Sequence, residues 1–376
     1  MIYLDHMATT PLDPSVIEAM APWLSGARFG NPHATANAAG RAAEQVVEGA
    51  VASIAAMIKA MPGEIILTSG ATESDNMALV GATRPGDHLI TVETEHSAVI
   101  AVARRLETQG RTVTIVGTDG AGRVDPAAIA AACRPETRLV SVMAINNETG
   151  TRQPIGEIGT HCRANDILFH SDATQALTTT AIDVRTQPID LLSISSHKLY
   201  GPQGIGALFV RDGVEVEPLI IGGGQQNDRR SGTVPVALAA GFGAACRAAI
   251  SGRDADHVRI AALRDRLWER LSGIPEARRT VPAEICAAHC LHVTVGGVDM
   301  TDILFDLPAL AASTGSACAS GGKSPVLQAM GMTPRQSFGA IRFGLGRFTT
   351  SEEVDAAAHM LSEAIARVRT RRSAAE

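Results

Sequence analysis

The chain has 376 residues, of which 45% are hydrophobic and 19% are charged, a composition typical of a globular protein long enough for two domains. Its formal net charge of −6 gives no positive field for binding nucleic acid directly. No apolar run is as long as a membrane span, and the first residues lack the order of a signal peptide. The six cysteines are scattered, which favours reduced thiols over a disulfide framework. We therefore expect a cytoplasmic protein that binds neither a membrane nor nucleic acid directly.

Apolar runs that favour strands alternate with helical patterns along the first two thirds of the chain. Strands are expected at 64–68, 88–92, 112–116, 138–143, 167–171, 190–194 and 205–210. Helices are expected at 15–23, 36–60, 73–81, 96–109, 125–133 and 155–165. This alternation predicts an α/β fold with a mainly parallel sheet that helices cover on both faces.

The last third of the chain has a different pattern. A long helix is expected at 234–251, followed by a more helical region with strands at 290–295 and 340–343. The change of pattern predicts two domains, a large one at 15–248 and a smaller one formed by 1–14 and 249–376.

The most informative stretch is Ser195-Ser196-His197-Lys198, which follows an apolar strand and precedes Gly201-Pro202. This order places Lys198 at the carboxyl edge of the sheet, where α/β proteins bind their ligands. A lysine in this position is costly unless it is paired or used covalently, and one use is a Schiff base with a carbonyl cofactor such as pyridoxal phosphate (PLP). For an isolated lysine, a place in a surface loop is the alternative.

A phosphate-binding turn is expected after the strand at 64–68. There Gly70, Ala71 and Thr72 open a helix, whose free N–H groups favour an anion, and the threonine hydroxyl can assist. A plain helix N-terminus is the alternative.

Two further strand ends carry side chains that suit a flat heteroaromatic ring. His96 follows the strand at 88–92 and can present its ring face in a chain with only two Trp and two Tyr. Asp172 follows another strand and can pair with a protonated ring nitrogen, while Gln175 can reach a ring hydroxyl. A structural histidine and a helix N-cap aspartate are the alternatives.

Two other residues indicate a site for a carboxylate. The stretch that contains Asn147 ends a strand and offers amide donors, and Arg342 lies within an apolar strand. A buried arginine needs an anion, and a substrate carboxylate bound by two parallel hydrogen bonds would supply one.

The remaining candidates are thiols. Cys318 lies among glycines and serines at 313–325. Structural cysteines are usually buried among apolar side chains, whereas a thiol on a polar, glycine-rich loop is placed to react. A second group of thiols and imidazoles has a spacing that could bind a metal: Cys286, His289, Cys290 and His292. This group leads into a predicted strand, and we expect no metal there.

Taken together, these stretches resemble the cysteine desulfurases of the NifS/IscS type, in the class V aminotransferase group. The likeness covers nearly the whole chain, and it implies the PLP-dependent transferase fold type I with a smaller α+β C-terminal domain that carries the catalytic cysteine. The matching stretches are 3–11, 29–32, 68–76, 94–96, 146–148, 172–175, 195–206, 230–233, 315–318 and 341–350.

The resemblance also implies roles for individual residues. Lys198 is the Schiff-base lysine, His96 stacks on the ring, and Cys318 is the nucleophile that takes sulfur. The implied cofactor residues are Ala71, Thr72, His96, Asp172, Gln175, Ser195, His197, Lys198 and, from the other subunit of a homodimer, Thr233. The substrate carboxylate is assigned to Asn147 and Arg342.

The implied reaction converts L-cysteine to L-alanine and leaves a persulfide on Cys318, which passes to an acceptor or scaffold protein. Selenocysteine lyase and class V aminotransferase are the alternative enzymes. Iron–sulfur assembly, transfer-RNA thiolation, cofactor sulfuration and DNA phosphorothioation are the candidate pathways, and the segment after Cys318 is about two residues shorter than in iron–sulfur relatives. The stretch 225–229 also lacks the His-Glu pair that relatives often carry after the glycines.

Overall fold

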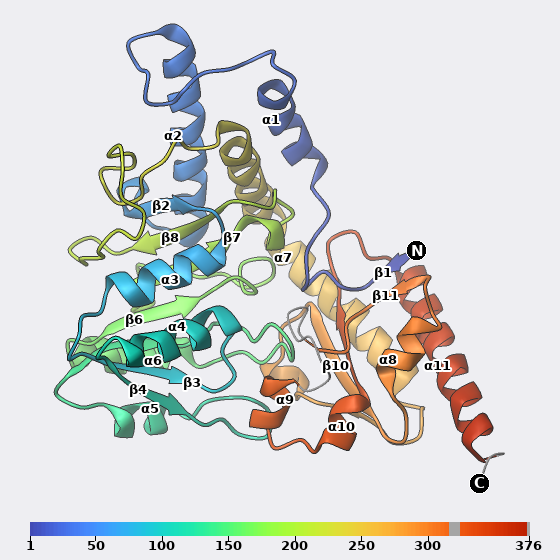
Figure 1. The fold of residues 1–376 in the computed structure, drawn as a ribbon. Helices are drawn as coiled ribbons and strands as arrows, with labels where there is room; N and C mark the ends of the chain where they lie inside the picture. The colour runs from blue at the N-terminus through green and yellow to red at the C-terminus, as the bar shows by residue number, and fades with distance from the viewer. Residues whose placement is uncertain (316–323, 374–376) are drawn as a thin grey trace.

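The computed structural model describes residues 1–315 and 324–373, and its largest element is a seven-stranded sheet (Figure 1). The strand order is β2-β8-β7-β6-β5-β3-β4. Only β8 runs antiparallel to its neighbours, so the predicted mainly parallel α/β sheet is confirmed. Its strands are β2 (Ile65–Thr68), β3 (His88–Val92), β4 (Thr112–Val116), β5 (Thr137–Ser141), β6 (Leu168–Asp172), β7 (Leu191–Ser195) and β8 (Gly206–Val210).

Helices cover both faces of this sheet. Alternate residues of each strand point to opposite sides, and apolar side chains lie on both sides. Ile66 and Leu208 pack in a cluster with α3 and α4, whereas Leu67 and Phe209 pack on the other side with α2, α5, α6 and α7. The helices are α1 (Pro14–Leu24), α2 (Ala38–Ile58), α3 (Ala71–Gly81), α4 (Ser97–Thr108), α5 (Pro126–Ala132), α6 (Ile155–Ala164) and α7 (Val236–Leu271).

The C-terminal part has its own small antiparallel sheet, in the order β12-β10-β9, and a two-stranded parallel sheet in which β1 pairs with β11. The N-terminus therefore joins the C-terminal part. Short 3-10 turns occur at Pro62–Glu64, Ser196–Lys198 and Ala283–Ile285. The elements are β1 (Ile2–Tyr3), β9 (Ala277–Arg279), β10 (Cys290–Val295), α8 (Met300–Phe305), β11 (Leu310–Ala311), α9 (Pro325–Ala329), α10 (Pro334–Phe338), β12 (Ala340–Gly344) and α11 (Ser351–Ser373).

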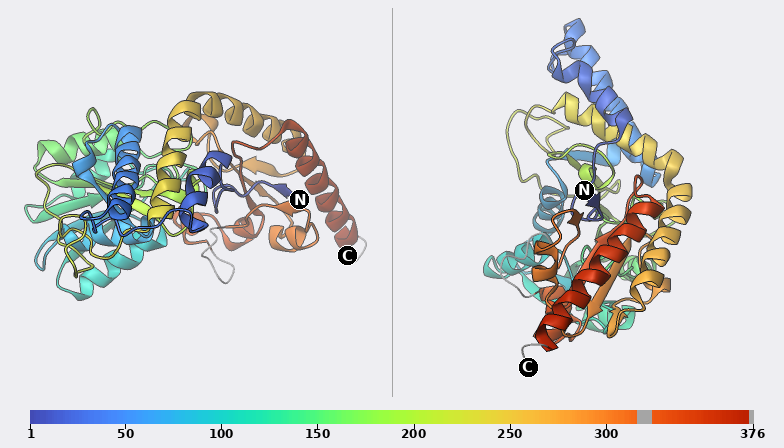
Figure 2. Two further views of the ribbon diagram at one scale, coloured as in Figure 1. Left: turned by 90° about the horizontal axis from the view of Figure 1, so that it is seen from above. Right: turned by 90° about the vertical axis from the view of Figure 1, so that its right-hand side faces the viewer.

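Helix α7 connects the two parts, and Figure 2 shows it running from the large sheet toward α11. Its first half, up to Ala249, belongs to the core of the large sheet. From Ile260 onward its buried residues belong to a second core with β10, β12 and α11. The helix therefore passes from one core to the other between Ala249 and Ile260, and the domain boundary at 248/249 stays a prediction.

The predicted end of α7 at residue 251 is wrong. The helix continues past Ser251, through a run that contains polar residues, to Leu271. Asp256 in this run is buried and accepts a hydrogen bond of 2.8 Å from Arg347 Nε, so tertiary contacts override the local polarity. Among the described residues, no helix has the length and apolarity needed to cross a membrane.

Candidate active site

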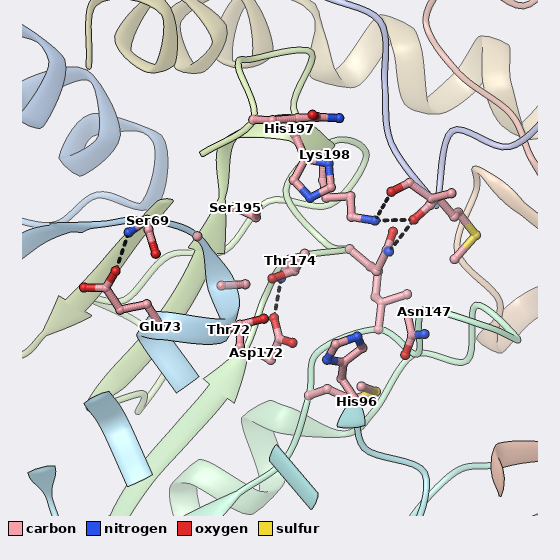
Figure 3. A pocket seen from close by; sticks show the side chains of 18 of the residues that line it. Ser69, Thr72, Glu73, His96, Asn147, Asp172, Thr174, Ser195, His197 and Lys198 are labelled. Atoms are coloured by element: carbon pink, nitrogen blue, oxygen red, sulfur yellow. Dashed lines mark hydrogen bonds between the residues drawn. The ribbon is translucent and has the colours of Figure 1, made fainter. Parts of the chain in front are cut away.

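A cavity of about 450 Å³ opens where several strands of the large sheet end, a size typical of small-molecule sites. It lies at the carboxyl ends of β2, β3, β5, β6 and β7, as the sequence predicts for an α/β ligand site. The predicted site residues that line it are Ala71, Thr72, His96, Asn147, Asp172, Gln175, Ser195, His197, Lys198 and Arg342. Figure 3 shows most of these side chains pointing toward one another.

The sheet face beneath α3 carries a polar patch, and two of its residues, Asp172 and Ser195, line the cavity. Strands β5, β6 and β7 each have a leucine near their start on this face, and these leucines belong to the apolar cluster under α3 and α4: Leu139, Leu168 and Leu191. Two and four residues further along the same strands, the same face carries polar side chains. We call these residues the polar patch: Ser141, His170, Asp172, Ser193 and Ser195.

The start of α3 forms the end of the cavity that suits an anion. Gly70 precedes the helix with φ +153°, in a region that favours glycine, and no side chain caps the helix. A Cβ at Gly206 would lie 2.7 Å from the Gly70 Cα, so only glycine allows β8 to approach this turn. The first N–H groups of the helix, at Ala71 and Thr72, therefore face the cavity without intrahelical partners.

Glu73 lies in the same first turn, and sequence reasoning did not single it out. Arg230 forms an ion pair with it at 2.8 Å, and Ser69 N donates to its other oxygen at 2.8 Å. Burial raises the pKa of Glu73, but the hydrogen bonds from Arg230 and Ser69 outweigh this effect and the net pKa is lowered. Arg230 thus compensates an acidic group beside the anion site.

Lys198 is held by the N-terminal segment of the chain. Its Nζ donates to the carbonyl oxygens of Met7 and Ala8, the latter at 2.7 Å. Gln175 Nε2 donates to the same Met7 oxygen at 2.9 Å. The sequence predicted Lys198 and Gln175, but nothing in it indicated that backbone carbonyls from residues 7 and 8 would position them.

His197 is also tied to this segment, since its Nδ1 lies 3.0 Å from Thr9 Oγ1. Burial, followed by the positive charge of Lys198, lowers the pKa of His197 to about 4. The imidazole is therefore neutral near pH 7 and can donate one hydrogen bond to an anion from the nitrogen that carries its proton.

Asp172 lies at the end of β6 and His96 follows β3, and β5 lies between these two strands in the sheet. Asp172 is 7% exposed and accepts a hydrogen bond of 2.8 Å from Thr174 N. His96 caps α4, and its Nδ1 accepts from Ala98 N at 3.1 Å, so a neutral His96 carries its proton on Nε2. This hydrogen bond fixes the ring orientation at the cavity wall.

Arg342 on β12 has an intramolecular anion that the sequence did not reveal. Its Nη2 donates to Asp5 Oδ1 at 2.6 Å and to Ser313 Oγ at 3.1 Å, and its Nη1 donates to the Asn147 carbonyl oxygen at 2.6 Å. Its Nε and the Asn147 Oδ1 are buried without a hydrogen-bond partner among the described residues. These hydrogen bonds fix the Arg342 guanidinium at the cavity, and its Nε can still donate a hydrogen bond.

Among the predicted site residues that the structure describes, Thr233 is exposed and does not line this cavity. Cys318 lies outside the described residues. The two histidines of the metal alternative contact other side chains, since His289 Nδ1 lies 2.8 Å from Thr179 Oγ1 and His292 Nδ1 lies 2.7 Å from Thr280 Oγ1.

Comparison with known proteins identifies the family of this chain. The family model described as aminotransferase class-V matches residues 2–357. The cysteine desulfurase IscS of Klebsiella pneumoniae subsp. pneumoniae is 43% identical over 98% of this chain and 93% of its own. The solved structure of a NifS-like protein is 31% identical, with a TM-score of 0.91 over 97% of this chain and 99% of that chain. The structure of SspA in complex with cysteine is 34% identical, with a TM-score of 0.81 over 93% of this chain and 100% of that chain.

The chain therefore belongs to the class V aminotransferase family. Its relatives within that family include cysteine desulfurases, and its structural neighbours include NifS-like proteins. The predicted family and fold type are both confirmed.

Proposed function

We propose that this chain is a PLP-dependent cysteine desulfurase that converts L-cysteine to L-alanine and retains the sulfur as a persulfide on Cys318. The observation that carries this proposal is the convergence of Lys198, Asp172, His96 and Arg342 on one cavity. The solved complex of a 34% identical neighbour with cysteine supports the choice of substrate.

The donor set of the cavity fits PLP. The open N–H groups at the start of α3, with Thr72, Ser195 and the neutral His197, suit a phosphate. Asp172 suits a protonated ring nitrogen, and Gln175 a ring hydroxyl. Lys198 lies on the same cavity wall with its Nζ already directed by backbone carbonyls. When bound, PLP supplies an electron sink that stabilises negative charge at the substrate Cα.

The chain's own residues then divide the work. Arg342 and Asn147 would bind the substrate carboxylate, Asp172 would pair with the ring nitrogen of bound PLP, and His96 would lie against the ring. Lys198 Nζ removes the proton from the substrate Cα, as a base positioned by the Met7 and Ala8 carbonyls.

Sulfur transfer is a displacement on the substrate sulfur. The Cys318 thiolate attacks the substrate Sγ, an S–S bond forms, and the Cβ–S bond breaks. The Cβ takes up a proton, so that L-cysteine and one thiol give L-alanine and one persulfide. No external oxidant or reductant is needed for this step.

We further infer a homodimer that transfers sulfur to an acceptor protein. Thr233 is exposed, and the segment before it exposes apolar side chains, with Ile221 85% exposed and Leu219 and Ile220 about 40%. An exposed apolar segment is typical of an interface, and the second subunit would bring Thr233 to its partner's phosphate site. The free thiols at the described cysteines support a reducing, cytoplasmic setting.

Product analysis tests the proposed reaction. With L-cysteine and a reductant, the protein is expected to release alanine and sulfide in equal amounts. An aminotransferase would instead pass the amino group to an oxo acid and release no sulfide. Formation of an oxo acid from cysteine in place of alanine would contradict the proposal.

Replacement of Arg342 by lysine tests the carboxylate site. We expect a loss of about 10- to 100-fold in kcat/KM, mainly through KM, because lost hydrogen bonds to charged groups cost about 1.5–3 kcal/mol. Steady-state alanine formation measures this effect. Arg266→Lys is the matched control, since Arg266 forms an exposed ion pair with Asp355 at 2.6 Å on the far helices. If both variants have the same kcat/KM, Arg342 does not bind the substrate carboxylate.

A further inference from the structure

Asp75 of α3 is a fully buried carboxyl group that the reaction described above does not use. It is 0% exposed and does not line the cavity. Neither of its oxygens has a hydrogen-bond partner of normal geometry among the described residues. A buried carboxylate in this condition is costly, because nothing replaces the water that it loses on folding.

The basic side chain beside Asp75 does not supply a positive charge. His170 of the polar patch is 0% exposed, and its Nε2 lies 3.7 Å from Asp75 Oδ1. Ser141 Oγ and Ser193 Oγ lie 2.8 and 3.0 Å from the two ring nitrogens of His170. Burial lowers the pKa of His170 to about 3, so the imidazole is neutral and forms no ion pair with Asp75.

The other elements packed against α3 offer no cation either. Strands β2, β7 and β8 carry no titratable side chain. The charged residues of α4 are exposed, and Glu73 of α3 itself is paired with Arg230. Within residues 1–315 and 324–373, the remaining titratable groups that act on Asp75 are both acids, Asp172 on β6 and Glu95 after β3.

We propose that Asp75 is an uncharged carboxylic acid and a positioning residue: by holding a proton, it leaves Asp172 as the anion of the polar patch that faces the cavity. Two ionised carboxylates on this face would repel each other and would favour protonation of Asp172. The consequence for Asp172 rests on the proposed function, whereas the protonation of Asp75 does not.

The electrostatics agree with this geometry. Burial raises the pKa of Asp75 well above its usual range, and the negative charge of Asp172 raises it further, which outweighs the opposing effect of the Ser193 hydroxyl. Glu95 behaves in the same way, because burial is the main cause that raises its pKa. Two buried acids near Asp172 are therefore expected to be protonated.

Infrared spectroscopy of the purified protein tests the proposal. At pH 8 the wild type is expected to show the carbonyl band of a protonated carboxylic acid, and Asp75→Asn is expected to lose part of that band. Asp212→Asn, at an exposed position, is the matched control and is expected to keep the whole band. A wild type without the band, or an Asp75→Asn variant that retains all of it, would overturn the proposal.

The coupling to Asp172 is tested in a second variant that leaves Asp75 intact. In Asp172→Asn, the Asp75 band is expected to disappear at lower pH than in the wild type, because the neighbouring negative charge is gone. An unchanged titration would refute the positioning role even if Asp75→Asn fails to fold. Neither measurement depends on turnover, so a failure of the desulfurase proposal, seen as absent alanine formation, is distinguishable from a failure of this one.

Unfolding provides an independent readout. An acid whose pKa is raised in the folded state stabilises the fold at low pH, and this contribution is lost as the pH rises from the unfolded value through the folded one. The melting temperature of Asp75→Asn relative to wild type is therefore expected to increase from pH 5 to pH 9. A difference that does not change with pH would mean that Asp75 is ionised in the folded protein.

Discussion

Lys198→Ala is expected to reduce alanine formation by about 10²- to 10⁴-fold, the range typical for loss of a positioned acid–base group. The reason is that Lys198 is the only lysine among the described residues that lines the cavity, and the Met7 and Ala8 carbonyls position its Nζ. Bound PLP is expected to lose its covalent attachment in the same variant. Borohydride reduction followed by peptide mapping measures this attachment directly.

The labelled peptide can be assigned without ambiguity, because the chain has only three lysines, at positions 59, 198 and 323. Lys59→Ala is the matched control, since Lys59 is 68% exposed and pairs with Asp183 at 2.7 Å on the surface. The control is expected to keep full activity and a labelled Lys198 peptide. Labelling of a different lysine, or a fully active Lys198→Ala protein, would contradict the assignment.

Cys318→Ser is expected to abolish persulfide formation and to lower sulfide release from cysteine by about 1000-fold or more, as for loss of a covalent nucleophile. Binding of cysteine is expected to remain, because its carboxylate is assigned to Arg342 and Asn147 and not to Cys318. A sulfide assay together with the absorbance of the cofactor on addition of cysteine separates these two effects.

The other thiols provide the control for this variant. Burial raises the pKa of Cys162 to about 12 and also raises that of Cys246, so these thiols are poor nucleophiles near pH 7. Cys133, which is only partly buried, is the suitable replacement site, and Cys133→Ser is expected to match wild type. Undiminished sulfide release from Cys318→Ser would favour a lyase that needs no enzyme thiol.

Much of the fold could be predicted because the pattern that specifies it is local. In β6, apolar Leu168 and Phe169 are followed by polar His170 and Asp172. This order indicates a buried strand whose carboxyl end lies at the site. The length of α7 could not be predicted, because the burial of Asp256 depends on Arg347, which lies 91 residues further along the chain.

Within the site, the residues that sequence reasoning found are those whose side chains carry the chemistry, such as Lys198 and Asp172. It missed the groups that position them. Met7 and Ala8 act through backbone carbonyls, which have no sequence signature. Asp5 reaches Arg342 only because β1 joins the C-terminal part of the fold. Asp75 reads as an ordinary helix residue until its burial is known.

The most direct test of the desulfurase account is a single turnover without reductant. The protein, loaded with PLP, is mixed with less than one equivalent of L-cysteine, and alanine and the mass of the Cys318 peptide are measured. The account predicts one alanine for each cysteine consumed and a gain of one sulfur atom on that peptide. Alanine formed with all of the sulfur free in solution, or a sulfur atom on another cysteine, would contradict it.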